Sequence, residues 1–189
     1  MFTGIIEKKS QILKIEGSRF TVENVFWSNE LQLGQSIAHD GACMTLEEIK
    51  KDSYSFFVME ESFRKLNFHR KQVWDYFNIE RCLKADDRID GHFVSGHVDT
   101  PWEVRVLTEV EDGSLIVWIE FEKWFSKYTI EKGSIALNGV SLTIVEKKQW
   151  FISVSLIPLT QDWTNLGILK LWHTINVEFD MLWKYILNK

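Results

Sequence analysis

An internal repeat is the feature that most constrains this chain. Residues 36–45, SIAHDGACMT, return as residues 134–143, SIALNGVSLT, ninety-eight positions later. The segments 2–7, FTGIIE, and 94–99, VSGHVD, also correspond, at an offset of ninety-two. Self-similarity of this kind indicates a repeated structural unit. The 189 residues are therefore predicted to form two copies of one small fold.

Each copy has the pattern of a mainly β structure. The segments 19–25 and 151–157 are short and rich in Val, Ile, Phe and Thr, and turn residues punctuate the chain around them. Short strands with closely spaced turns suggest a small barrel or sandwich. Residues 60–66 and 159–163 are predicted to form short helical turns at matching places. The predicted domains are residues 1–88 and 89–180, followed by a short C-terminal helix over 181–189.

Composition excludes several functional classes. The net charge of -5 argues against a nucleic-acid partner, which would require a basic face. No apolar run approaches the roughly 20 residues that span a bilayer, so no membrane association is expected. The two cysteines, Cys43 and Cys82, form no CxxC or zinc spacing. A cytoplasmic protein without metal or cofactor is the expectation.

The repeated turn places polar side chains at matching positions. Cys43 and Thr45 are two apart on a predicted strand and share one face, and Ser141 and Thr143 repeat this arrangement in the second copy. A solvated strand face explains one such pair taken alone. Its recurrence after a Gly turn in both copies points to two equivalent shallow sites.

Two histidines invite a metal interpretation that their spacing disfavours. His92 and His97 are five apart, which puts them on opposite faces of any regular strand. His97 with Asp99 on one strand face could instead act as a general acid or base, although a structural histidine explains the pattern equally well. Cys43 has no neighbouring histidine that would support a thiolate nucleophile.

Four strings in order resemble the riboflavin synthase family: the opening MFTGIIE, residues 91–99 (GHFVSGHVD), 138–143 (NGVSLT) and 155–158 (SLIP). The resemblance covers nearly the whole chain. It implies two tandem six-stranded Greek-key β-barrels with a C-terminal helix that helps to build a homotrimer. It also implies a cofactor-free transferase that converts two 6,7-dimethyl-8-ribityllumazine molecules into riboflavin and 5-amino-6-ribitylamino-2,4-pyrimidinedione. Lumazine synthase is then a candidate partner.

The same resemblance assigns site residues, with the reacting pair held between the first barrel of one subunit and the second barrel of its neighbour. Residues implied in catalysis are His97, Ser141, Cys43, Phe2 and Asp180. Residues implied in substrate binding are Gly4, Ile5, Thr45, Met59, Glu61, Ser62, Gly96, Val98, Lys132, Thr143, Ile157 and Thr160.

Several positions depart from the family pattern. Asn138 stands where relatives often have Asp, which removes a charge near Ser141 but keeps hydrogen-bonding capacity. Four tryptophans stand where relatives typically have Gly, and at positive φ each should cost of order 1 kcal/mol; they are Trp74, Trp102, Trp172 and Trp183. The short C-terminus leaves little for an assembly helix.

Two alternatives remain beside the enzyme. A non-catalytic lumazine- or flavin-binding homologue would have the same barrels, but such proteins look degraded in the GHFVSGH and SLT segments, which are intact here. A flavoprotein oxidoreductase domain would require a nicotinamide-binding Rossmann unit with its Gly-rich turn. The sequence contains no such turn.

Overall fold

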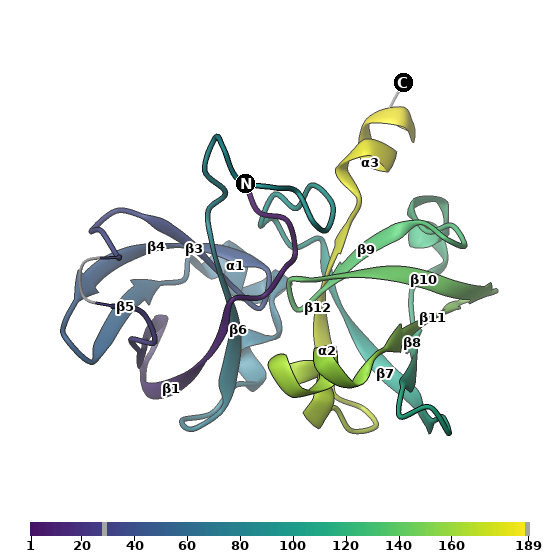
Figure 1. Cartoon of the computed structure of the whole chain (residues 1–189), viewed down its shortest axis with the longest axis horizontal. Helices are drawn as coiled ribbons and strands as arrows, with labels where there is room; N and C mark the ends of the chain where they lie inside the picture. Colours follow the sequence, from purple (N-terminus) through teal and green to yellow (C-terminus); the bar gives the residue numbers. More distant parts are fainter. Residues whose placement is uncertain (28–29, 188–189) are drawn as a thin grey trace.

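Two closed six-stranded antiparallel barrels lie side by side in the computed structural model, which describes residues 1–27 and 30–187 (Figure 1). The first barrel runs β1-β2-β5-β4-β3-β6 and the second β7-β8-β11-β10-β9-β12, which is the same order in both copies. The two copies predicted from the repeat and the tandem six-stranded barrels implied by the family resemblance are confirmed. The strands of the first are β1 Lys8–Glu16, β2 Arg19–Glu23, β3 Ser36–His39, β4 Ala42–Ile49, β5 Ser53–Phe57 and β6 Tyr76–Arg81. Those of the second are β7 Thr100–Glu109, β8 Leu115–Glu120, β9 Ser134–Leu137, β10 Val140–Lys148, β11 Phe151–Leu156 and β12 Thr174–Phe179.

Short helices connect the strands at matching places. The predicted helical turns are present and lie at equivalent positions, directly after β5 and β11. The predicted C-terminal helix is also present and stands out from the barrels in Figure 1; residues 188–189 of the predicted segment lie outside the described residues. The helices are α1 Glu60–Lys65, η1 Asn67–Arg70, η2 Lys123–Tyr128, α2 Pro158–Trp163, η3 Asn165–Ile168 and α3 Met181–Leu187. No helix in the described ranges has the length and apolar character that a membrane crossing requires.

Alternation along the strands fills each barrel with apolar side chains. On β4, Met44 and Leu46 are buried while Thr45 is exposed, as the period of two requires. The first barrel holds an aromatic cluster around Phe20 and Phe77, whose ring centroids lie 5.9 Å apart. The second barrel is mainly aliphatic. The cores form separately, so the contact between the barrels depends on other residues.

The opening segments of the two halves pair with each other between the barrels. Phe2 and Val94 form an antiparallel bridge in which each backbone N–H donates to the other's carbonyl, at 2.7 and 3.1 Å. Phe2 is fully buried in a small cluster with Val94, Ala38 and Ala136. Because equivalent segments meet, the contact is reciprocal and relates the two barrels by an approximate two-fold axis.

A glutamate at the end of each closing strand holds the opening segment. Glu80 of β6 accepts hydrogen bonds from the backbone N–H groups of Thr3 and Gly4, at 2.7 and 3.0 Å. Glu178 of β12 accepts from the N–H groups of Ser95 and Gly96, at 2.6 and 3.0 Å. Burial raises the pKa of Glu80 to about 7 and also raises that of Glu178, while the donors oppose the shift.

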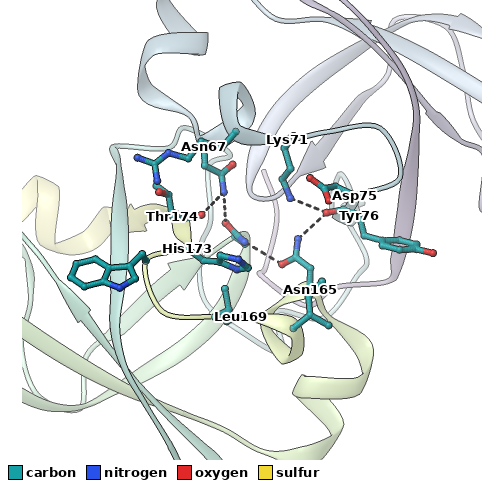
Figure 2. Close-up of a pocket in the computed structure, with 12 residues that line it drawn as sticks. Asn67, Lys71, Asp75, Tyr76, Asn165, Leu169, His173 and Thr174 are labelled. Atoms are coloured by element: carbon teal, nitrogen blue, oxygen red, sulfur yellow. Dashed lines mark hydrogen bonds between the residues drawn. The ribbon is translucent and has the colours of Figure 1, made fainter.

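Buried asparagines join the barrels around the same axis. The side-chain oxygen of Asn78 accepts from the backbone N–H of Asn165 at 2.7 Å, and that of Asn176 accepts from the N–H of Asn67 at 2.7 Å. Figure 2 shows part of this network, in which the Asn67 amide donates to the Thr174 carbonyl, around an inter-barrel cavity of about 230 Å³. These bonds satisfy polar groups that contact between the barrels removes from water.

The network departs from symmetry at one pair of positions. Asp40 is fully buried and pairs with Lys71, with 2.6 Å between the carboxylate oxygen and Nζ. At the equivalent positions of the second half stand Asn138 and Leu169. The aspartate expected from relatives at Asn138 is thus absent there, and the Asp40–Lys71 ion pair lies within the first half, where that half faces the second barrel.

The tryptophan substitutions divide into two groups. Trp74 and Trp172 have positive φ values of 80° and 69°, so these two occupy the backbone conformation that favours glycine. Trp102 is instead a buried residue of β7, and Trp183 lies in α3. The expected strain therefore applies to the first two.

Candidate ligand sites beside β4 and β10

A cavity of about 300 Å³ opens beside β4 and collects most of the residues predicted for the first half. We call it the β4 site. Strand β4, the start of α1 and the opening segment of the second half all contribute to its wall. Its lining residues are Ala42, Cys43, Met44, Met59, Glu61, Ser62, Lys65, Leu66, Gly96, His97 and Val98.

Close backbone contact shapes the β4 site. The Cys43 N–H donates to the Gly96 carbonyl at 2.8 Å, which attaches the second opening segment to the first barrel. Gly96 has φ of 84°, and a Cβ at this position would lie 2.7 Å from both Cys43 Cβ and the Phe2 ring. Only glycine permits this approach. The fully buried Phe2 ring therefore packs beneath Gly96, on the protein side of the site.

The equivalent surface of the second half, the β10 site, is built in the same way. The Ser141 N–H donates to the Gly4 carbonyl at 2.8 Å, so the first opening segment lies against β10. A Cβ on Gly4 would lie 2.6 Å from Ser141 Cβ. By the two repeat offsets, the β10 site comprises Val140, Ser141, Leu142, Ile157, Leu159, Thr160, Trp163, Thr164, Gly4, Ile5 and Ile6.

The two sites share a backbone but differ in chemistry. Glu61 and Lys65 of the β4 site form an exposed ion pair at 3.3 Å, whereas Leu159 and Trp163 hold the equivalent positions. His97, exposed at the β4 site, corresponds to Ile5. A ligand at the β10 site therefore meets a more apolar rim.

His92, which lies outside the repeated segments, places its imidazole at the β10 site. His92 Nδ1 lies 2.7 Å from Ser141 Oγ. His92 precedes residues 94–99, which repeat residues 2–7, so the repeat does not supply an equivalent of it for the β4 site. Burial lowers the pKa of His92, and the carboxylate of Asp180 opposes that shift. His92 and His97 thus serve different sites.

Other predicted residues lie at varying distances from these surfaces. Thr45 and Thr143 are exposed on the faces of β4 and β10, but Thr45 is outside the lining of the β4 site. Lys132 is exposed in the loop before β9 and has φ of 65°. Asp180 follows β12, where its side chain accepts from the Leu182 N–H at 2.9 Å. Burial raises the pKa of the Cys43 thiol, which disfavours the thiolate.

The residues predicted from the sequence omit several contributors to the sites, among them His92, Lys65 and Leu66. The sequence suggests only a metal-ligand role for His92, whereas in the structure this residue contacts Ser141. Lys65 and Leu66 line the β4 site, although no sequence motif marks them. Their positions in and after α1, beside Glu61 and Ser62, were the available signal.

Comparison with known proteins agrees with this geometry. The lumazine binding domain model matches residues 3–82 and 95–180, once for each barrel. The fold and the paired sites therefore define a tandem lumazine-binding-domain protein. The structure of LumP complexed with riboflavin superimposes with a TM-score of 0.86, at 24% identity over 95% of this chain and 99% of that one; this likeness shows the fold.

Relatives of similar length carry the comparison further. The chain is 36% identical to riboflavin synthase of Escherichia coli (strain K12), over 95% of this chain and 87% of that protein. It is 35% identical to riboflavin synthase of Actinobacillus pleuropneumoniae, over 98% and 88% of the two chains. The chain belongs to the riboflavin synthase family.

Proposed function

We propose that this chain is a transferase that makes riboflavin from two molecules of 6,7-dimethyl-8-ribityllumazine. The single observation that supports this most directly is the pair of equivalent sites, one beside Cys43 and one beside Ser141, in a chain of this family. Two like sites suit a reaction between two like molecules. One lumazine gives up a four-carbon unit and leaves as 5-amino-6-ribitylamino-2,4-pyrimidinedione, while the other becomes riboflavin.

The reaction needs little from the protein beyond placement and proton transfer. The two products together contain the atoms of the two substrates, so no external oxidant or reductant takes part. The C7 methyl of the lumazine is acidic because its anion delocalises into the ring system. Holding two reactants in register can contribute roughly 7 to 11 kcal/mol. His97, Ser141 and Asp180 are the proposed proton-handling residues, and Cys43 lines the β4 site together with His97.

The reacting pair is proposed to lie between the β4 site of one subunit and the β10 site of its neighbour in a homotrimer. Helix α3 supports an assembly, because Leu182, Tyr185 and Ile186 are each more than half exposed. Apolar side chains left in water in this way favour contact with another protein surface. The same proposal places the enzyme in the cytoplasm, with lumazine synthase as a supplier of substrate.

The decisive test is a reaction with the lumazine as the sole substrate. Purified chain, treated with a metal chelator, should form riboflavin and the pyrimidinedione in equal amounts, measured by flavin fluorescence and chromatography. Binding of the lumazine without any product would favour the non-catalytic homologue. The relatives named riboflavin synthase favour the enzyme over that alternative.

Mixing two inactive variants tests where the site is. Cys43→Arg fills the β4 site and Ser141→Arg fills the β10 site, so each variant alone should be inactive. If the site spans two subunits, exchange of subunits between the two variants brings an intact β4 site together with an intact β10 site at about a quarter of the subunit contacts. Activity should then return on mixing. No recovery despite exchange, shown by mass measurement of mixed oligomers, would place the site within one chain.

A further inference from the structure

Two hydrogen bonds in series join the closing strand of the first barrel to the β10 site. Glu80 Oε2 accepts from the Gly4 N–H at 3.0 Å, and the Gly4 carbonyl accepts from the Ser141 N–H at 2.8 Å. Glu80 Oε1 also accepts from both the N–H and the hydroxyl of Thr3, at 2.7 and 3.0 Å. A carboxylate of the first barrel thus holds the segment that forms part of the site in the second barrel.

The second barrel repeats this arrangement in the opposite direction. Glu178 Oε2 accepts from the Gly96 N–H at 3.0 Å, and the Gly96 carbonyl accepts from the Cys43 N–H at 2.8 Å. Glu178 Oε1 accepts from the N–H and the hydroxyl of Ser95, at 2.6 and 2.7 Å. Glu178 is outside the lining of the β4 site, whereas Gly96 is part of it. The glutamate therefore acts on that site through the segment that it holds.

Burial makes each glutamate depend on the opening segment that it holds. Glu80 is 6% exposed and Glu178 is 3% exposed. A like charge, that of Glu7, acts on Glu80, whereas Lys184 attracts Glu178. A buried carboxylate that loses its hydrogen-bond donors is costly, because water does not replace them. Each opening segment is therefore restricted to the position in which it forms part of a site.

We propose that Glu80 and Glu178 are crossed positioning residues, each of which fixes the wall of the ligand site in the barrel to which it does not belong. Glu80 fixes the β10 site through Gly4, and Glu178 fixes the β4 site through Gly96. The inference rests on the proposed function for the identity of the ligand, a lumazine or a flavin. Its consequence is that each site needs the closing strand of the other barrel to hold a ligand firmly.

A purely structural role for the glutamates predicts the opposite pattern. Within the first barrel, Glu80 of β6 pairs with Ala38 of β3, and Ala38 pairs with Cys43 of β4. If Glu80 only stabilised its own barrel, its loss would therefore disturb the β4 site first. In the second barrel, Glu178 is related to the β10 site in the same way, through β9. The site that responds to each substitution thus separates the two roles.

Riboflavin titrations of the full chain, followed by the backbone amide NMR signals of Ser141 and Cys43, measure the two sites separately. Glu80→Gln replaces one acceptor oxygen by an N–H group, so one donor of the opening segment loses its partner. We expect riboflavin to bind on the order of tenfold more weakly when read at Ser141, with little change at Cys43. Glu178→Gln should give the reverse. Hydrogen exchange of the same amides without ligand should accelerate in the same crossed pattern.

Glu7→Gln is the matched control, because Glu7 ends the same opening segment but accepts from the Arg81 N–H, which glutamine can also do. Both amides should keep their parental values in this control. Thr3→Val and Ser95→Ala each remove one hydroxyl donor, and they should give the same crossed pattern in milder form if the glutamine variants fold poorly. Losses in the barrel that carries the substitution, or equal losses at both amides, overturn the inference, while riboflavin formation by the parent sustains the proposed function. Crossed losses in a parent that forms no riboflavin sustain the inference and overturn the function.

Discussion

Trp74 and Trp172 are equivalent residues in left-handed conformation that differ in their contacts. Each lies in the turn before a closing strand, β6 or β12, with its side chain about two-thirds exposed. An L-residue in this conformation costs roughly 1–2 kcal/mol that glycine does not. The Trp172 ring lies under the Arg105 guanidinium at 4.2 Å, and within residues 1–27 and 30–187 no cation lies over the Trp74 ring. The strain is thus partly offset at one position only.

Replacement by glycine should therefore stabilise the chain unequally. We expect Trp74→Gly to raise the free energy of unfolding by about 1 kcal/mol. Trp172→Gly should gain less, because it also loses a cation–π contact of about 0.5–1 kcal/mol. Urea unfolding of both variants beside the parent measures the difference. A larger gain for Trp172→Gly would show that the contact with Arg105 contributes nothing.

At the scale of elements, the repeat predicted the strands and short helices well because their alternation is local. It did not predict that each opening segment lies against the other barrel. Gly4 hydrogen-bonds to Ser141 and Gly96 to Cys43, contacts that join residues from different halves. Nothing in the spacing of the strands encodes such a crossing. The glycines at matching positions of the two openings, Gly4 and Gly96, were the signal, since close backbone approach is what glycine permits.

In the glutamates that hold these opening segments, burial raises the carboxyl pKa and hydrogen bonds from the segment lower it. Burial raises the pKa of Glu80 to about 7, so between about pH 4.5 and 7 the native state holds a proton that the unfolded chain releases. Because the unfolded state binds fewer protons there, the free energy of unfolding should fall as pH rises through this interval. The expected change is about 3 kcal/mol, and chemical unfolding at several pH values measures it.

Glu80→Gln supplies the reference, because glutamine does not titrate. The stability of the parent relative to this variant should decline from about pH 4.5 to 7. Glu178→Gln is the matched variant in the second half, where burial also raises the carboxyl pKa but the charge of Lys184 opposes it; its decline should be smaller. A parent that instead gains on Glu80→Gln with rising pH would mean that the donors from Thr3 and Gly4 outweigh burial.

For the molecule as a whole, the sequence predicted two equivalent sites but not their inequality. The family resemblance identifies site residues individually. Among those it identifies, Cys43, Met59, Glu61 and His97 line the β4 site. His92 lies outside the segments that the two halves share, so comparison of the two halves could not assign it. Its contact with Ser141 arises where the connection between barrels folds back over β10, which only the tertiary structure shows.

The contact between the barrels carries a second asymmetry, the buried pair Asp40–Lys71. In the second half, the Asn138 amide donates to the Asn165 side-chain oxygen at 3.1 Å. In the first half, the equivalent residues are Asp40 and Asn67, and the Asp40 carboxylate has no N–H to donate. The side-chain oxygen of Asn67 therefore lacks a donor among the described residues. The ion pair thus replaces a neutral arrangement that the same fold already uses. Buried pairs of this kind are often no better than their neutral replacements.

Exchange of the first pair for its counterpart tests this balance. Lys71→Leu alone should lower the free energy of unfolding by about 3 kcal/mol or more, because the fully buried Asp40 keeps a charge without a partner. Adding Asp40→Asn should recover most of the loss, since the new amide can donate to Asn67. Asn138→Asp should destabilise in the same way, and Leu169→Lys should rescue it. Urea unfolding of the single and double variants gives the coupling energies, and simple additivity in either half would mean that the two residues of that pair act independently.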